Sequence, residues 1–348
     1  MLTWLTDTID PRPLGLARIV VGIAAVVRGL VSWPLLTKLA DDEILRAPYL
    51  DWIPQPSLAF AVGIVAVWLC AAILFTLGYR VGITGIFLLS AILLTLALDQ
   101  QTYSNHLYLM AWLVGLMTLA DAGAGVSVSR ANRAVVRWPV LLLMMQASIV
   151  YGFSGLTKIN SDFVSGRVLA ASVRGGLVEF PAALRTPEFL SALALVVIAV
   201  ELFLAIFLWR ALLRPAAFLL GLGLHISITV LMTNTIELLV FSLEMLALYP
   251  LFLEGRLRVS VDPQSRWPDR IRSYDLLRIV DIEPQTGARE LTVSHHGIMS
   301  RGAAAHTRIL EHLVPWLWVA PMLRLPGVAT WHRRRHAPDS MLESTADA

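Results

Sequence analysis

The sequence predicts an all-α polytopic membrane protein with about eight transmembrane helices and a small α/β cytoplasmic tail. Hydrophobic residues make up 57% of the chain and charged residues only 15%, whereas roughly a quarter of an average soluble domain is charged. The mean hydropathy is +0.68. Apolar runs recur up to residue 253 and the composition turns polar after it, so the membrane domain is predicted to span 1–255.

Each predicted helix has close to the roughly 20 apolar residues that a bilayer core of about 30 Å requires. Short breaks rich in Gly, Asn or charged residues separate several of these runs, as at 78–80, 210–215 and 233–234. In chain order, the predicted spans lie near 14–33, 58–78, 82–98, 105–120, 138–157, 189–209, 215–235 and 237–253.

Basic residues in the loops predict the topology, because cytoplasmic loops of membrane proteins carry an excess of Lys and Arg. This bias predicts a multi-pass inner-membrane protein with cytoplasmic N- and C-termini and with His106 and Lys158 on the extracytoplasmic side. The connection 158–188 carries four basic residues on the predicted outer side. We therefore expect it to form a re-entrant or interfacial segment. The residues that set the predicted cytoplasmic side are Arg12, Arg80, Arg130, Arg133, Arg137, Arg210, Arg214 and the Arg-rich tail.

Composition also excludes several classes of function. The single cysteine, Cys70, lies within an apolar run, so the chain has neither an internal disulfide nor a dithiol redox centre. The net charge of +3 resides in loops and tail, which suits membrane lipids as partners and argues against nucleic acid. The tail histidines, which include His296 and His336, form no i, i+4 pair within a helix, so no metal is expected.

Two polar clusters, 102–106 and 154–160, lie at the ends of apolar runs. In the second, Tyr151, Ser154 and Lys158 follow an i, i+3, i+7 spacing and share one helical face. Spacing alone favours a Lys158 that extends to lipid headgroups. The alternative is a desolvated amine that acts as a free base, since burial disfavours the ammonium form.

Other polar residues within the apolar runs fit either a site or a scaffold. His225 is a secondary site candidate, although a buried histidine bonded to a neighbouring helix is equally expected. Arg18, Arg28, Glu201 and Glu244 have opposite signs that favour structural ion pairs, with Arg18 and Glu201 the first pair to test.

The amino-acid sequences of both clusters resemble the HTTM domain, the transmembrane module of vitamin K-dependent gamma-carboxylases and of many bacterial membrane proteins. Residues 148–166 resemble the segment of that family with an apolar helix, Gly-x-x-Lys and an aromatic-x-x-Gly close, and 104–109 resembles its Asn-His-x-Tyr-Leu stretch. The resemblance spans roughly 10–255. It implies that Lys158 is the catalytic base and that His106 serves quinone oxygenation chemistry.

The same resemblance implies a reduced quinone, vitamin K hydroquinone or menaquinol-like, as the cofactor. The residues expected to bind it are Asn105, Tyr151, Ser154 and His225.

The tail, 256–336, is predicted to hold short strands near 281–284, 289–293 and 295–299 and a helix over 302–314. Its Gly-x-x-x-Arg-Gly-x-x-Ala turn and Leu-Pro-Gly close resemble the DCC family of thioredoxin-like oxidoreductases. The paired cysteines of that family are absent, which implies a degenerate tail without thiol chemistry. Residues 337–348 are expected to be a disordered C-terminus.

The leading functional expectation is a quinone-linked, gamma-carboxylase-like enzyme that acts on a protein or peptide substrate on the extracytoplasmic side. The alternative is a non-catalytic membrane scaffold or a lipid- or quinone-binding protein. A transporter is disfavoured, because no paired Gly/Pro breaks occur in two corresponding halves.

Overall fold

The computed structural model describes residues 3–41, 43–49, 52–129, 133–253, 257–288, 290–295, 297–314 and 316–335. The chain forms two compact units: unit 1 comprises Met1–Ala205 and Leu224–Leu251, and unit 2 comprises Ile206–Gly223 and Phe252–Ala348. His296, His336, the predicted domain boundary at 255/256 and the predicted disordered segment 337–348 lie outside the described residues.

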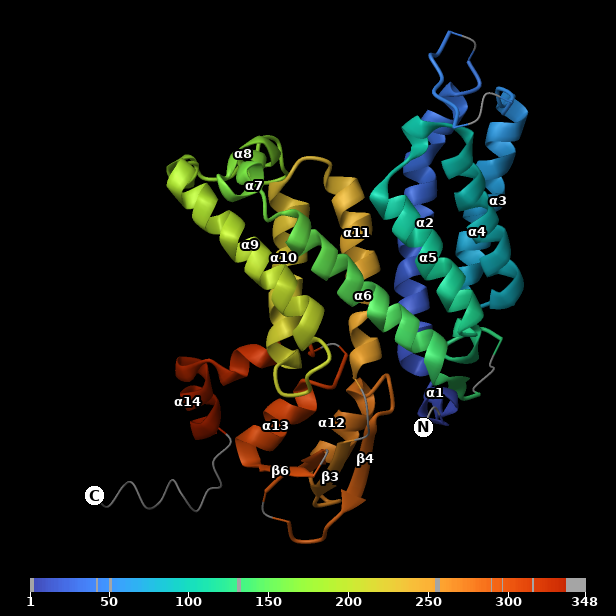
Figure 1. Ribbon diagram of the computed structural model, residues 1–348. Coiled ribbons are helices and arrows are strands. Elements are labelled where there is room, and N and C mark those ends of the chain that lie inside the picture. Colours follow the sequence, from blue (N-terminus) through green and yellow to red (C-terminus); the bar gives the residue numbers. More distant parts are fainter. Residues whose placement is uncertain are drawn as a thin grey trace. The chain divides into compact units, whose positions relative to one another are not determined.

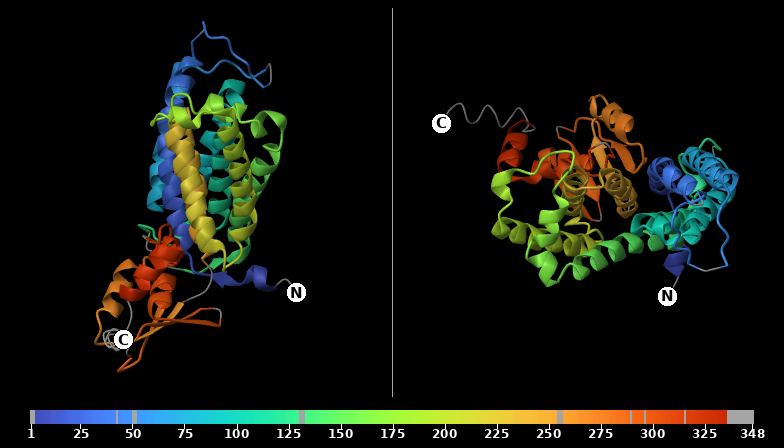
Figure 2. Two further views of the ribbon diagram at one scale, coloured as in Figure 1. Left: turned by 90° about the vertical axis from the view of Figure 1, so that its left-hand side faces the viewer. Right: turned by 90° about the horizontal axis from the view of Figure 1, so that it is seen from above.

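Long helices dominate unit 1 and run side by side (Figures 1 and 2). Helix α10 begins in unit 2 and ends in unit 1. A two-stranded antiparallel sheet joins β1 (Thr8–Ile9) to β2 (Val135–Val136). The helices are α1 (Thr3–Thr6), α2 (Arg12–Lys38), α3 (Leu58–Leu77), α4 (Val81–Leu98), η1 (Gln100–Thr102), α5 (Asn105–Leu119), η2 (Ala122–Ala124), α6 (Arg137–Thr157), α7 (Ser161–Val164), α8 (Arg167–Ser172), η3 (Ala182–Leu184), α9 (Pro187–Phe207), α10 (Arg214–Leu231), α11 (Thr235–Ala247) and η4 (Tyr249–Phe252).

Seven helices of the described chain are long and apolar enough to cross a membrane, against the prediction of about eight. The difference is the predicted span at 105–120, which forms the 15-residue helix α5. This helix ends where Asp121 adopts a left-handed conformation with φ 56° and the short η2 follows. The predicted break at 233–234 between the last two spans is present, with Asn234 left-handed at φ 61° before α11.

Small residues let α2 approach α3 closely, as is common between membrane helices. The indole of Trp68 is fully buried, and its Nε1 donates a 2.9 Å hydrogen bond to the carbonyl oxygen of Ala25. A Cβ atom at Gly29 would lie 3.0 Å from the Trp68 ring. Glycine at this position therefore gives the indole its space.

The expected ion pair between Arg18 and Glu201 is wrong. Arg18 is fully buried and donates hydrogen bonds of 2.8 Å to the Ala122 carbonyl and 2.7 Å to the Val126 carbonyl. The guanidinium thereby binds the irregular backbone after α5, whose carbonyls lack helical partners. Glu201 has a different partner, described below.

The connection 158–188 is a compact helical segment built on α7, α8 and η3. Asn160 begins α7, because its Oδ1 accepts hydrogen bonds from the backbone N–H groups of Asp162 and Phe163. Gly166 adopts a φ of +78° between α7 and α8, which favours glycine. Apolar side chains of the segment form an interior cluster with α9, made of Phe163, Leu169, Val173, Phe180, Leu190, Ala194 and Ile198.

Unit 2 contains a four-stranded sheet with the order β4-β3-β5-β6. Strand β3 (Leu257–Val261) pairs parallel with β4 (Val280–Pro284) and antiparallel with β5 (Thr292–His295), which pairs with β6 (Ile298–Arg301). Helix α12 (Trp267–Tyr274) connects the two parallel strands. Helices α13 (Gly302–Leu310) and α14 (Pro326–Arg335) and the short η5 (Ala320–Arg324) complete the unit.

Alternating burial along β3 directs Leu257, Val259 and Val261 into an apolar cluster with Ile271 and Ile309. The predicted strand near 281–284 is present as β4, and the predicted helix over 302–314 is present as the shorter α13, which ends at Leu310. Unit 2 also includes the first half of α10, where the Phe218 ring lies 5.6 Å from the Trp318 ring. Phe218 and Trp318 thus belong to the same compact unit.

Candidate functional site

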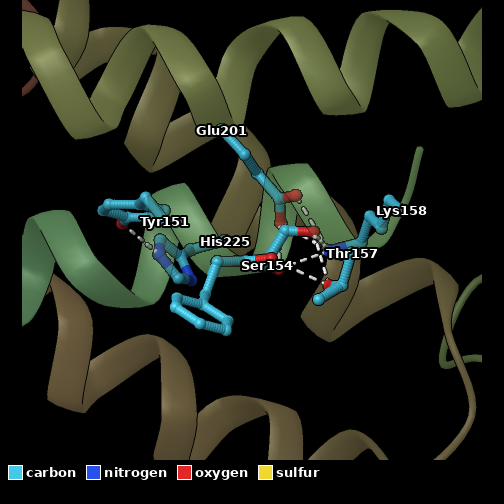
Figure 3. A network of polar contacts seen from close by, with 7 residues as sticks. Tyr151, Ser154, Thr157, Lys158, Glu201 and His225 are labelled. Atoms are coloured by element: carbon cyan, nitrogen blue, oxygen red, sulfur yellow. Dashed lines mark hydrogen bonds and ion pairs between the residues drawn. The ribbon is translucent and has the colours of Figure 1, made fainter.

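The amine of Lys158 lies against the carboxylate of Glu201 at the end of α6. Its Nζ is 2.8 Å from each carboxylate oxygen of Glu201, which belongs to α9 (Figure 3). Ser154, one turn earlier, donates a 2.9 Å hydrogen bond from Oγ to Oε1 of Glu201 and also contacts Nζ. The Glu201 side chain is only 9% exposed and that of Lys158 only 25%. The three side chains form one polar cluster between two apolar helices.

A glycine allows the two helices to meet at this point. A Cβ atom at Gly155 would lie 2.9 Å from Leu202 and 3.4 Å from the Cβ of Glu201. Because α9 approaches α6 this closely, the Glu201 side chain is long enough for its carboxylate to contact the amine of Lys158.

An aromatic ring lies beside the ammonium group. Nζ of Lys158 is 5.6 Å from the centre of the Phe163 ring, within the range of a cation–π contact. Phe163 is buried in α7, whose first turn is capped by Asn160. The polar stretch after Lys158 therefore fixes the ring that borders its amine.

Tyr151 contributes to a second polar network deeper along α6. Its hydroxyl is 2.7 Å from Nε2 of His225 on α10 and 2.8 Å from the hydroxyl of Tyr249. All three side chains are at least 98% buried. Since a hydroxyl has one proton, Tyr151 donates to one of these neighbours and accepts from the other.

The other ring nitrogen of His225 also has a partner. Nδ1 is 3.2 Å from Oγ of Ser242 on α11, and the same hydroxyl is 3.0 Å from Oγ1 of Thr229. Three membrane helices are thus joined through satisfied polar groups, as a buried histidine in an apolar environment requires.

Asn105 and His106 line a cavity of about 410 Å³ at the start of α5. The hydroxyl of Tyr103 donates a 2.9 Å hydrogen bond to Oδ1 of Asn105. The ring of His106 packs 4.6 Å from that of Phe241 on α11. Phe241 also lies 5.5 Å from the ring of His225, so one phenyl ring contacts both histidines.

An ion pair borders the same cavity. Arg28 is 93% buried and donates a 2.8 Å hydrogen bond from Nη1 to the carboxylate of Glu237. Glu244 lies seven residues further along α11 and is fully buried. Within the residues that the structure describes, its carboxylate oxygens have no hydrogen-bond partner. Arg28 therefore pairs with Glu237, which the sequence analysis did not name, and not with Glu244.

The structure brings the six sequence-derived site residues together in three groups. Ser154 contacts Lys158, Tyr151 contacts His225, and Asn105 shares a cavity with His106. No hydrogen bond or ring contact joins His106 to Lys158 within the described chain. Sequence reasoning missed that Glu201 is the partner of Lys158, although it did note Glu201 as an intramembrane carboxylate.

The choice of lysine at position 158 is informative. The chain has two lysines, Lys38 and Lys158, among 28 basic residues. Arginine is thus the usual cation of this chain and the usual partner of a buried carboxylate in proteins. A lysine that contacts a buried carboxylate departs from both tendencies.

A protein-family model described as the HTTM domain matches residues 7–256. This range includes all six sequence-derived site residues and Glu201. No solved structure matches the chain.

Proposed function

The chain belongs to the HTTM domain family, because the family model covers residues 7–256 of its 348, and we propose that it is a quinone-linked membrane enzyme related to the vitamin K-dependent carboxylases. The observation that carries the proposal is the Lys158–Glu201 pair, with both carboxylate oxygens 2.8 Å from Nζ. This pair is an acid–base centre in an environment of low polarity.

Lys158 is the proposed general base. Transfer of one proton from Nζ to an oxygen of Glu201 gives a neutral amine and a neutral acid. Because the net charge of the pair does not change, burial does not oppose this transfer. The free amine can then accept a proton from a bound hydroxyl group, while the Ser154 hydroxyl keeps Glu201 in place through its hydrogen bond to Oε1.

The cavity beside His106, which Lys158 does not line, is the proposed site for the ring of a reduced quinone. Its volume of about 410 Å³ lies within the range of about 300–1,000 Å³ typical of small-molecule sites. Such a cofactor would supply an acidic hydroxyl and an oxidisable ring. Asn105 and His106 would donate hydrogen bonds to its oxygens, and His106 would stabilise negative charge there. Tyr151 and His225 would fix the helices around the site through their shared hydrogen bond.

A non-catalytic scaffold that binds lipid or quinone is the second candidate. The observation that favours it is that Lys158, Glu201 and Ser154 satisfy one another, as structural ion pairs do. Replacing Lys158 with arginine distinguishes the two functions. A scaffold needs only the positive charge, whereas a base needs a side chain that can lose its proton.

The test uses the purified protein in liposomes, with quinones in its lipid extract identified by mass spectrometry. Lys158→Arg should lower oxygen-dependent quinol turnover by about 10²-fold to 10⁴-fold, because guanidinium stays protonated. The matched control is Lys38→Arg at the exposed end of α2, which should keep wild-type turnover. Wild-type turnover in Lys158→Arg, or a protein that binds quinone without turnover, would establish the scaffold.

We further propose the topology in which both termini are cytoplasmic and residues 105, 106 and 158 face the outside, where a peptide substrate would enter. The basic-loop asymmetry supports it. In a Cys70→Ser background, an impermeant thiol reagent should label Leu45→Cys and not Ser340→Cys in intact cells. The reverse labelling pattern would invert the topology.

For the tail we propose a role without thiol chemistry, because Cys70 is the only cysteine of the chain. A thiol–disulfide activity that survives Cys70→Ser would contradict this.

A further inference from the structure

A second and larger pocket lies within unit 2, outside the site described above. Its volume is about 590 Å³, and helices α12, α13 and α14 and the turn after α13 line it. Figure 1 shows these helices in orange and red. The volume again falls in the range of about 300–1,000 Å³ of ligand sites.

Aromatic side chains form the walls of this pocket. Tyr274 and Trp316 make an edge contact with ring centres 6.0 Å apart, and Trp331 and Trp267 also line it. Tyr274, Trp316 and Trp331 are 44%, 41% and 54% exposed. Aromatic surface of this extent around one cavity indicates a site for an apolar ligand.

The polar lining is basic or neutral. His306 and His332 join through a 2.8 Å hydrogen bond between Nδ1 and Nε2 with their rings stacked. Arg270 is the charged side chain among the described lining residues, which include neither Asp nor Glu. Arg266, which immediately precedes α12, is also exposed. This charge pattern favours a ligand with an anionic group.

Unit 2 itself connects this pocket to the membrane. It contains the first half of the membrane-spanning helix α10, whose Phe218 packs against Trp318. Trp318 lies two residues from Trp316 in the pocket wall. Tryptophan beside the end of a membrane helix is typical of the headgroup region, where anionic lipids attract arginine.

We propose that this aromatic pocket binds an anionic phospholipid from the adjacent leaflet. An acyl chain lies against the four aromatic rings, and Arg270 binds the phosphate group. Such a lipid holds α12, α13 and α14 at the membrane end of α10. The site is separate from the Lys158 centre and does not depend on the proposed quinone chemistry.

Native mass spectrometry of the full chain tests this proposal after exchange into nanodiscs of phosphatidylglycerol or of phosphatidylcholine. One phosphatidylglycerol should remain bound, and phosphatidylcholine should not. Arg270→Gln should weaken phosphatidylglycerol binding about fivefold, and Trp331→Ala should weaken it further. The matched controls are Arg272→Gln and Leu276→Ala, which change exposed residues of unit 2 outside the pocket lining and should keep the lipid.

Ser273→Phe provides a second test, because it fills the pocket from an exposed position and leaves the aromatic walls intact. Its melting temperature should match that of the wild type while the lipid is lost. Equal retention of phosphatidylglycerol by Arg270→Gln, Trp331→Ala and Ser273→Phe would overturn the proposal. Equal binding of phosphatidylcholine would also overturn it, since the lipid would then be held without recognition of its charge.

Discussion

Each unit of the chain buries a glutamate in an ion pair, and the two pairs use different cations. In unit 1, Glu201 contacts Lys158 and Ser154. In unit 2, Glu311 is 97% buried and accepts two hydrogen bonds from Arg324, at 2.5 and 2.7 Å. The bidentate pair raises the pKa of the Arg324 guanidinium above its usual value.

The choice of arginine or lysine as the cation decides whether such a pair can take part in acid–base chemistry. A guanidinium matches a carboxylate with two parallel N–H groups and does not give up its proton. A lysine gives less geometric restraint, yet its amine exchanges protons when it is desolvated. The proposed role of Lys158 as a base rests on this difference, whereas the bidentate Arg324–Glu311 pair restrains two segments of the tail.

The largest expected effect is from Lys158→Met, which leaves the Glu201 carboxylate buried without its cation. Loss of one member of a buried pair should lower the free energy of unfolding by about 3 kcal/mol. Titration with SDS in mixed micelles measures this. The double variant Lys158→Met/Glu201→Gln should recover most of the loss. If the single variant stays within about 0.5 kcal/mol of wild type, as for a surface change, the two groups do not interact.

The tail should lose stability in acid, because the buried His312 stays neutral in the folded chain and gains a proton when the chain unfolds. Burial, together with the charge of the neighbouring His295 and Arg308, lowers the pKa of His312 to about 3. Below about pH 6.5 the unfolded chain binds a proton that the folded chain does not, so stability falls as the pH drops towards 3. The expected loss between pH 7 and pH 5 is about 2 kcal/mol.

Thermal unfolding of the full chain at several pH values measures this dependence. His312→Asn should flatten it, since an amide can replace the hydrogen bond from Nδ1 to the Arg308 carbonyl and does not titrate. An unchanged slope in that variant would assign the acid sensitivity to another group.

The smallest expected effect is from Arg324→Lys, which keeps the charge and removes the fork of two N–H groups. The free energy of unfolding should fall by about 1 kcal/mol, the contribution of one hydrogen bond. Quinol turnover in the same preparation should stay at the wild-type level. A loss of turnover would show that the tail pair also serves the chemistry, and the contrast with Lys158 would fail.

Periodicity and composition were sufficient to predict most of the membrane helices, since apolar length is a local property. The limits appear where the backbone leaves the helix. Asp121 ends α5 early through a left-handed turn, and strand β3 was missed because its parallel partner β4 is separated from it by α12. Sheet pairing of this kind depends on residues far apart in the chain.

The candidate site shows the same limit. Spacing along one helix placed Ser154 beside Lys158, since residues four apart share a face. It gave no means to choose between Arg18 and Lys158 as the partner of Glu201, because that choice depends on how α6 and α9 pack. Arg18 binds backbone carbonyls of the loop after α5 instead, and no charge pattern in the sequence marks those groups.

The membership of the first half of α10 in unit 2 has a consequence for biosynthesis. Phe218 leaves the ribosome well before its contact Trp318. At about 5–20 residues per second, the 100 residues between them take about 5–20 s to synthesise. During that interval Phe218, in the first half of α10, lacks its contact with Trp318. Unit 2 can therefore complete its packing only after residue 318 has been made.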